Sequence, residues 1–214
     1  MNFVSNVTEL TTAGTDLLLA MAALVAIYIL RTRSPATQRT SYWLSIFSCL
    51  VVAALLGAVA HGVELPGQAG KYMWLVIYLA LALLVAMFVV AVIYDVFGAV
   101  NARRSMLPMI VIALGFVTYV ATFSTSFLPF IVYEALAMLF ALSGYVYLSV
   151  RGFVGANWFS LGILLTLIAA GIQATKALAF TLIWPFDHNS VYHLLQIVAL
   201  GLLLKGVLLS REKL

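Results

Sequence analysis

Seven long apolar runs follow one another along this chain and leave little room for any other kind of structure. A helix needs about 20 mostly apolar residues to cross a bilayer, and each run is close to or above that length. Lipid offers no hydrogen-bond partner to the backbone, so each crossing segment must be a helix. We therefore expect an all-α fold, a seven-transmembrane helix bundle in a single domain over residues 1–214. The expected helices are roughly 13–31, 41–64, 71–98, 106–124, 127–150, 156–183 and 189–210.

The composition supports the same fold class. Of the 214 residues, 65% are hydrophobic and only 8% are charged, which excludes an ordinary soluble domain. The net charge of +4 comes from scattered basic residues, so it does not indicate nucleic-acid binding. The single cysteine, Cys49, lies within an apolar run, and one cysteine cannot form a disulfide within one chain.

The basic residues are distributed unevenly between the two sides of the predicted bundle. Lys71 lies on one side, and the other side carries Arg31, Arg33, Arg39, Arg103, Arg104, Arg151, Arg211 and Lys213, with Lys205 nearby. Loops rich in Lys and Arg stay in the cytoplasm. We therefore expect a multi-pass protein with its N-terminus outside and its C-terminus inside, in the bacterial inner membrane or another cell membrane.

Ionisable residues within the apolar runs are the candidate functional residues, because burying them in lipid costs several kcal/mol each. With the predicted topology, nearly all of them fall in the outer half of the membrane. Asp16 is expected in the first turn of the first helix and Glu134 about two turns into the fifth. Gln173 and Lys176 are expected two to three turns inside the end of the sixth helix, and Glu134 and Lys176 could pair across helices.

The spacing of the two histidines near the seventh run limits how their side chains could approach one another. His188 and His193 are five residues apart, which places them about 140° apart on an ideal helix. They can converge only if His188 lies in the cap or just before the first turn. Asp187 or Asn189 as the N-cap residue makes that arrangement plausible.

Three neutral imidazoles, those of His61, His188 and His193, around one point would suit a zinc ion. A catalytic zinc commonly keeps three protein ligands and one water, whose pKa the metal lowers to near 7. Glu64, three residues after His61 and on the same helix face, and Asp187 are the candidate general bases, with Glu134 as a third. Each histidine also has a structural interpretation, as an interfacial or solvated side chain. Asp95 is expected to form a structural ion pair with Arg103 or Arg104.

A histidine near the end of the second helix and histidines at the start of the seventh resemble the CREST superfamily of membrane hydrolases, which includes the alkaline ceramidases and the progestin and adipoQ receptors. The resemblance implies an intramembrane zinc held by three histidines and hydrolysis of a lipid amide. His61 matches the helix-two ligand and His193 the second helix-seven ligand. Asn189 and Gly57 stand where the family carries a histidine and a serine, and residues 71–78 lack the family's aspartate.

Three functions remain open from the sequence. The first is a zinc-dependent intramembrane hydrolase that takes a membrane lipid amide or ester as its substrate. The second is a seven-helix receptor or sensor that binds a ligand or protons without catalysis. The third is a small transporter or b-type haem carrier, with His61 and His193 as the axial ligands of the haem.

Overall fold

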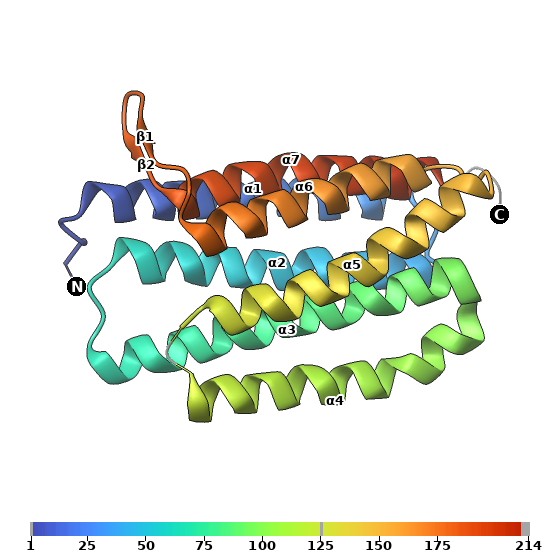
Figure 1. Cartoon of the computed structure of the whole chain (residues 1–214), viewed down its shortest axis with the longest axis horizontal. Helices are drawn as coiled ribbons and strands as arrows, with labels where there is room; N and C mark the ends of the chain where they lie inside the picture. Colours follow the sequence, from blue (N-terminus) through green and yellow to red (C-terminus); the bar gives the residue numbers. More distant parts are fainter. Residues whose placement is uncertain (1, 125, 211–214) are drawn as a thin grey trace.

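The computed structural model describes residues 2–124 and 126–210. Within these ranges seven helices are long and apolar enough to cross a membrane, which confirms the all-α seven-helix fold (Figure 1). The helices are α1 (Val7–Arg33), α2 (Gln38–Gly62), α3 (Gly67–Phe97), α4 (Ala99–Phe123), α5 (Leu128–Val150), α6 (Ala156–Thr175) and α7 (His188–Leu209).

The start of α1 differs from the sequence prediction. Asn6 caps the helix by accepting a hydrogen bond from the backbone N–H of Thr8, so α1 begins at Val7 rather than at residue 13. Asp16 therefore lies in the third turn and not in the first. At roughly 1.5 Å per residue, it is about 13 Å along the helix from Val7.

The connection between α3 and α4 is also shorter than expected. Gly98, with a φ of 86°, is the only residue between the two helices. This left-handed conformation is one that glycine adopts at little cost. Helix α4 therefore begins at Ala99 instead of residue 106.

The predicted sixth helix is too long. Helix α6 ends at Thr175, and Lys176 follows it in the left-handed conformation with a φ of 54°. A short antiparallel hairpin, β1 (Phe180–Thr181) and β2 (Pro185–Phe186), then leads into α7. Figure 1 shows this hairpin projecting sideways from the bundle. Residues 176–183 are therefore outside any helix.

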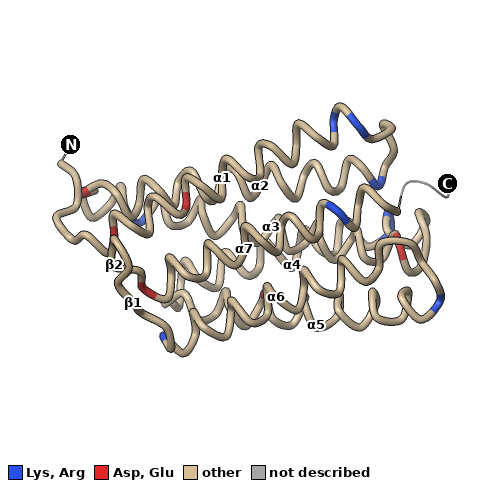
Figure 2. The backbone as a smooth tube through the Cα atoms, turned by 90° about the horizontal axis from the view of Figure 1, so that it is seen from above, with Lys and Arg blue, Asp and Glu red and all other residues tan. Residues whose placement is uncertain are grey.

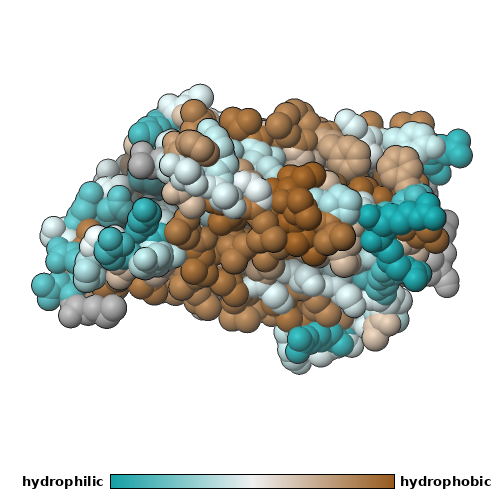
Figure 3. All heavy atoms as spheres, turned by 90° about the horizontal axis from the view of Figure 1, so that it is seen from below, coloured by the Kyte–Doolittle hydropathy of each residue, from teal (hydrophilic) through white to brown (hydrophobic). Residues whose placement is uncertain are grey.

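The helices pack as a bundle whose order follows the chain only in part. Helix α1 lies between α2 and α7, and α3 packs against α2, α4 and α5. Helix α5 crosses the bundle obliquely, and α4 lies at the edge against α3 (Figure 1). Figure 3 shows an apolar band between two more hydrophilic ends, as expected for a protein surrounded by lipid.

The charges are divided between the two ends of the bundle. Figure 2 shows most of the Lys and Arg positions at the end where α1 finishes and most of the acidic positions at the opposite end. The described residues of the basic end include Arg31, Arg33, Arg39, Arg103, Arg104 and Arg151. Arg211 and Lys213, which also entered the orientation prediction, lie outside the described residues.

A buried ion pair joins two helices at the basic end of the bundle, but its partners differ from those predicted. Arg39 donates two hydrogen bonds to Asp95, at 2.6 and 2.7 Å, and the Tyr145 hydroxyl donates a third at 2.9 Å. The expected pairing of Asp95 with Arg103 or Arg104 is therefore wrong. The Arg39–Asp95 contact joins α2 to α3 in the bidentate geometry that suits a guanidinium.

Candidate functional site

A cavity of about 850 Å³ lies inside the bundle and is lined by residues from all seven helices. Along α2 it extends from Ile46 to His61, which corresponds to roughly 22 Å of helix. Its inner walls are apolar and include Leu19, Phe47 and Phe88. The polar lining residues come from the half of the bundle where α1 begins, so the cavity combines a long apolar wall with a polar region.

A row of hydrogen bonds holds α1 against α7 beside this polar region. Asp187 is the N-cap of α7 and accepts hydrogen bonds from the backbone N–H and the hydroxyl of Ser190, at 2.9 and 3.0 Å. The Thr12 hydroxyl of α1 also donates to Asp187, at 3.1 Å. Burial acts to raise the pKa of Asp187, but these hydrogen bonds to the carboxylate outweigh it and leave the pKa below its ordinary value.

The imidazole of His193 is held at both ring nitrogens by consecutive residues of α1. Its Nδ1 lies 3.0 Å from the hydroxyl oxygen of Thr15, and its Nε2 lies 3.3 Å from Oδ1 of Asp16. The Thr15 hydroxyl donates its own proton to the carbonyl of Thr12 at 2.9 Å, so it accepts the proton of His193 Nδ1.

The second oxygen of Asp16 has no such partner. Asp16 is only 4% exposed, and its Oδ2 is buried without a hydrogen-bond partner among the described residues. A glycine on α2 makes room for it: a Cβ atom added to Gly57 would lie 2.8 Å from this oxygen. Asp16 is also among the residues that line the cavity, so this unsatisfied acceptor belongs to a side chain of the cavity wall.

Glu134 of α5 is the second buried carboxylate of the cavity, and it is 6% exposed. Its two oxygens share the hydroxyl of Tyr192, each at 3.5 Å. The predicted pairing with Lys176 is wrong, since no ion pair in the described part of the chain joins Glu134 to a base. We call Asp16, Glu134, Tyr192 and His193 together the polar cluster.

The other two histidines also line the cavity, but they have different surroundings. His61, in the last turn of α2, has its Nδ1 2.6 Å from a carboxylate oxygen of Glu9, and its ring lies edge-on to Trp74. His188 is the first residue of α7, directly after the predicted cap Asp187. All three histidines therefore line the same cavity, but lining one cavity does not bring them around one point.

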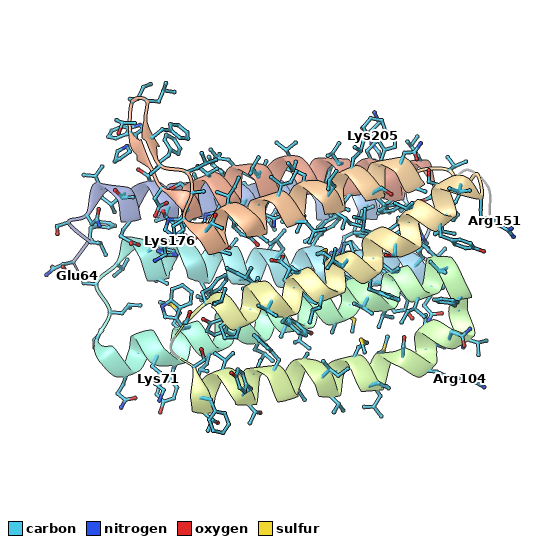
Figure 4. All side chains as sticks on the ribbon, in the orientation of Figure 1. Glu64, Lys71, Arg104, Arg151, Lys176 and Lys205 are labelled. Atoms are coloured by element: carbon cyan, nitrogen blue, oxygen red, sulfur yellow. The ribbon has the colours of Figure 1, made fainter. Side chains whose placement is uncertain are left out.

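The two predicted general bases do not line this cavity. Asp187 is occupied by the capping hydrogen bonds described above. Glu64 is exposed and follows α2, and Figure 4 shows it at the end of the bundle, away from the cavity. Its backbone is tied to the N-terminal segment, because the Glu64 N–H donates to the carbonyl of Asn2 at 3.0 Å.

Whether these histidines could bind a zinc ion depends on whether their ring nitrogens are available as ligands. His61 is engaged by Glu9, and both nitrogens of His193 are engaged by Thr15 and Asp16. Over residues 2–124 and 126–210, no group of three His, Cys, Asp or Glu side chains is arranged to hold a metal ion. In this arrangement the histidines do not form a ready zinc site, and zinc binding stays a prediction.

Several site residues were absent from the sequence prediction, namely Glu9, Thr12, Thr15, Tyr192 and Ser190. The threonines and Asp16 occupy positions 12, 15 and 16, which share one helix face. In a membrane helix such a polar face usually marks a contact with another helix. That periodicity was a signal in the sequence, but the partner helix could not be deduced from it.

The fold and the cavity define this protein as a multi-pass membrane protein with seven helices and an internal site of ligand size. A family model described as "Family of unknown function (DUF6962)" matches residues 11–212, and the chain belongs to this family. Neither the curated proteins nor the solved structures include a significant match to the chain.

Proposed function

We propose that this protein binds an amphipathic small molecule inside the membrane. The apolar body of the molecule lies along the inner wall of the cavity, and a hydrogen-bond donor on it reaches the polar cluster. The observation that carries the proposal is that Asp16, a residue of the cavity wall, has a buried oxygen, Oδ2, without a hydrogen-bond donor among the described residues. A ligand that donates a hydrogen bond there would remove the cost of an unsatisfied buried acceptor, about 1–3 kcal/mol.

The shape and chemistry of the cavity support this proposal. Ligand sites are usually concave, mostly apolar and roughly 300–1,000 Å³ in volume, with a few polar groups that orient the ligand. The cavity, at about 850 Å³, falls within this range. Its polar groups gather in one half, so a molecule with one polar end matches it better than a uniformly polar solute.

The orientation of the site in the membrane belongs to the same proposal. Six arginines of the described residues lie at the end opposite the polar cluster, and basic loops favour the cytoplasm. We infer that the polar cluster faces the outer leaflet and that the ligand is a membrane lipid or another amphiphile of that leaflet.

The test is saturable binding of a long-chain alcohol with a fluorophore at its tail, with the protein in nanodiscs of zwitterionic lipid. We expect Asp16→Ala to weaken binding about tenfold or more, which corresponds to about 1.4 kcal/mol. The matched control is Glu64→Ala, which removes an exposed carboxylate outside the cavity and should leave the affinity unchanged. Equal binding by wild type and Asp16→Ala would count against the proposal.

Zinc-dependent hydrolysis of a lipid amide or ester, as in the CREST superfamily, is the second candidate. The observation in its favour is that His61, His188 and His193 all line the same cavity. It requires His61 to leave Glu9 and His193 to leave Asp16. Elemental analysis of purified protein tests it: about one zinc per chain, lost in the triple alanine variant of these histidines, supports a zinc site, and a metal-free wild type excludes it.

A further inference from the structure

We infer that the ligand of this cavity carries an amine, and that its ammonium group binds between Asp16 and Glu134. The inference rests on the proposed function and names the chemical class of the ligand: an amphiphilic amine with a long apolar body. It is drawn from the balance of hydrogen-bond donors and acceptors and from the charges around the polar cluster.

The polar cluster has more acceptors than donors. The carboxylates of Asp16 and Glu134 present four oxygens. Within the described residues the side chains that contact them are His193, whose Nε2 lies 3.3 Å from Asp16, and Tyr192, whose hydroxyl lies 3.5 Å from both oxygens of Glu134. These contacts are longer than the usual 2.7–3.2 Å for an N–H donor and 2.5–3.0 Å for an O–H donor. A ligand with several donors would satisfy this surplus.

The charges of the cavity-lining side chains also favour an amine as the ligand. Buried carboxylates in proteins are normally paired with a cation or hold a proton. Among the described lining residues the Lys and Arg side chains are Lys71 and Lys176, and neither forms an ion pair with Asp16 or Glu134. Both lysines are exposed, and Figure 4 shows Lys71 at the end of the bundle and Lys176 at the end of α6. Among the described residues Glu134 therefore has no cationic partner and Asp16 has only His193, so a cationic ligand would balance the charge of both carboxylates.

An ammonium group suits this position. It offers three donors and one positive charge, and charge-assisted hydrogen bonds are roughly twice as strong as neutral ones. Asp16 contacts His193, and His193 lies beside Tyr192, which contacts Glu134. One ammonium could thus donate to both carboxylates, while the apolar body extends along Phe47 and Phe88.

The experiment compares three probes that share one long chain and one tail fluorophore and differ only in the head group: amine, alcohol and carboxylic acid. Binding is measured in zwitterionic nanodiscs. We expect wild type to bind the amine about tenfold more tightly than the alcohol, and the acid most weakly. In the double variant Asp16→Asn with Glu134→Gln, the preference for the amine over the alcohol should fall to about none. Glu64→Gln, the matched control, should keep it.

The outcomes separate this inference from the proposed function. If the alcohol and the amine bind wild type equally, or the acid binds best, and Asp16→Ala still weakens binding, the amine is excluded and the proposed function stands. If no probe binds saturably, the proposed function fails as well. Because the comparison of head groups uses wild type, it does not depend on the folding of any variant.

Discussion

Gly57 on α2 leaves the space that the carboxylate of Asp16 on α1 occupies, since a Cβ atom at residue 57 would lie 2.8 Å from Asp16 Oδ2. We predict that Gly57→Ala displaces this carboxylate, weakens ligand binding and costs about 1–3 kcal/mol through overpacking. The measurement is the thermal midpoint of unfolding together with probe affinity. Gly14→Ala on α1 is the control, because its Cβ would meet no atom within 4 Å. Equal losses in the two variants would contradict the account.

Asp187 should make stability depend on pH in the acidic range. Because its pKa is lowered in the folded protein, its ionised form contributes stability that is fully present above the unfolded pKa, about 3.9. This contribution is lost as the pH falls through the lower, folded value. We expect the gap in thermal midpoint between wild type and Asp187→Asn, which keeps a capping side chain, to shrink from neutral pH to below about 4. A gap that stays constant over this range would show that the charge is unimportant.

Removal of the capping side chain itself is a separate prediction. Asp187→Ala should destabilise the protein by about 1 kcal/mol at neutral pH, since Ser190 and Thr12 both lose their acceptor. The thermal midpoint again provides the measurement, and Asp187→Asn should recover most of the loss. A full loss in Asp187→Asn would mean that the cap is not the source of the effect.

The buried pair at the basic end should be sensitive to removal of one partner. We expect Asp95→Ala to cost about 3–5 kcal/mol, because the guanidinium of Arg39 would remain buried without a counter-charge. Replacing both, as in Arg39→Met with Asp95→Leu, should restore much of the stability. The measurement is thermal unfolding in detergent, with Arg104→Ala as an exposed control. If the double variant is less stable than Asp95→Ala, the explanation by an unpaired charge is wrong.

The two lysines beside the cavity should lower the affinity for an amine ligand through charge repulsion. Lys71→Gln with Lys176→Asn removes both charges, and asparagine tolerates the left-handed conformation at residue 176. We predict a roughly twofold to fivefold gain in affinity for the amine probe, and a loss of similar size for the acid probe. Arg103→Gln with Arg104→Gln removes the same charge at the other end and should change neither affinity. A weaker affinity for the amine in the lysine variant would contradict an ammonium between Asp16 and Glu134.

Hydrophobicity made the fold predictable, because only helices can cross lipid and the seven runs are long enough to do so. The errors in the predicted helix boundaries come from capping residues and turns. The Asn6 cap extends α1 beyond its apolar run, and the Gly98 turn extends α4. The predicted sixth helix counted the apolar hairpin residues as helical, although α6 ends before Lys176.

The candidate site was predictable only as a set of residues. The cost of burying ionisable side chains in lipid identified Asp16, Glu134 and His193 as candidates, and all three line one cavity. Their partners depend on the rotation of each helix about its axis, which sequence spacing does not determine. For this reason the contact of Asp16 with His193 and the contact of Arg39 with Asp95 emerged only from the three-dimensional arrangement.

Photo-crosslinking tests the central claim most directly. The probe is a long-chain amine with a diazirine in the middle of its chain, applied to wild-type protein in nanodiscs and mapped by mass spectrometry. The account predicts labelling of cavity-lining segments such as 46–57 of α2 and 192–203 of α7, which excess unlabelled amine suppresses and Gly57→Ala reduces. Labelling confined to exposed positions of α4 such as Leu107 and Val111, and insensitive to competitor, would contradict it.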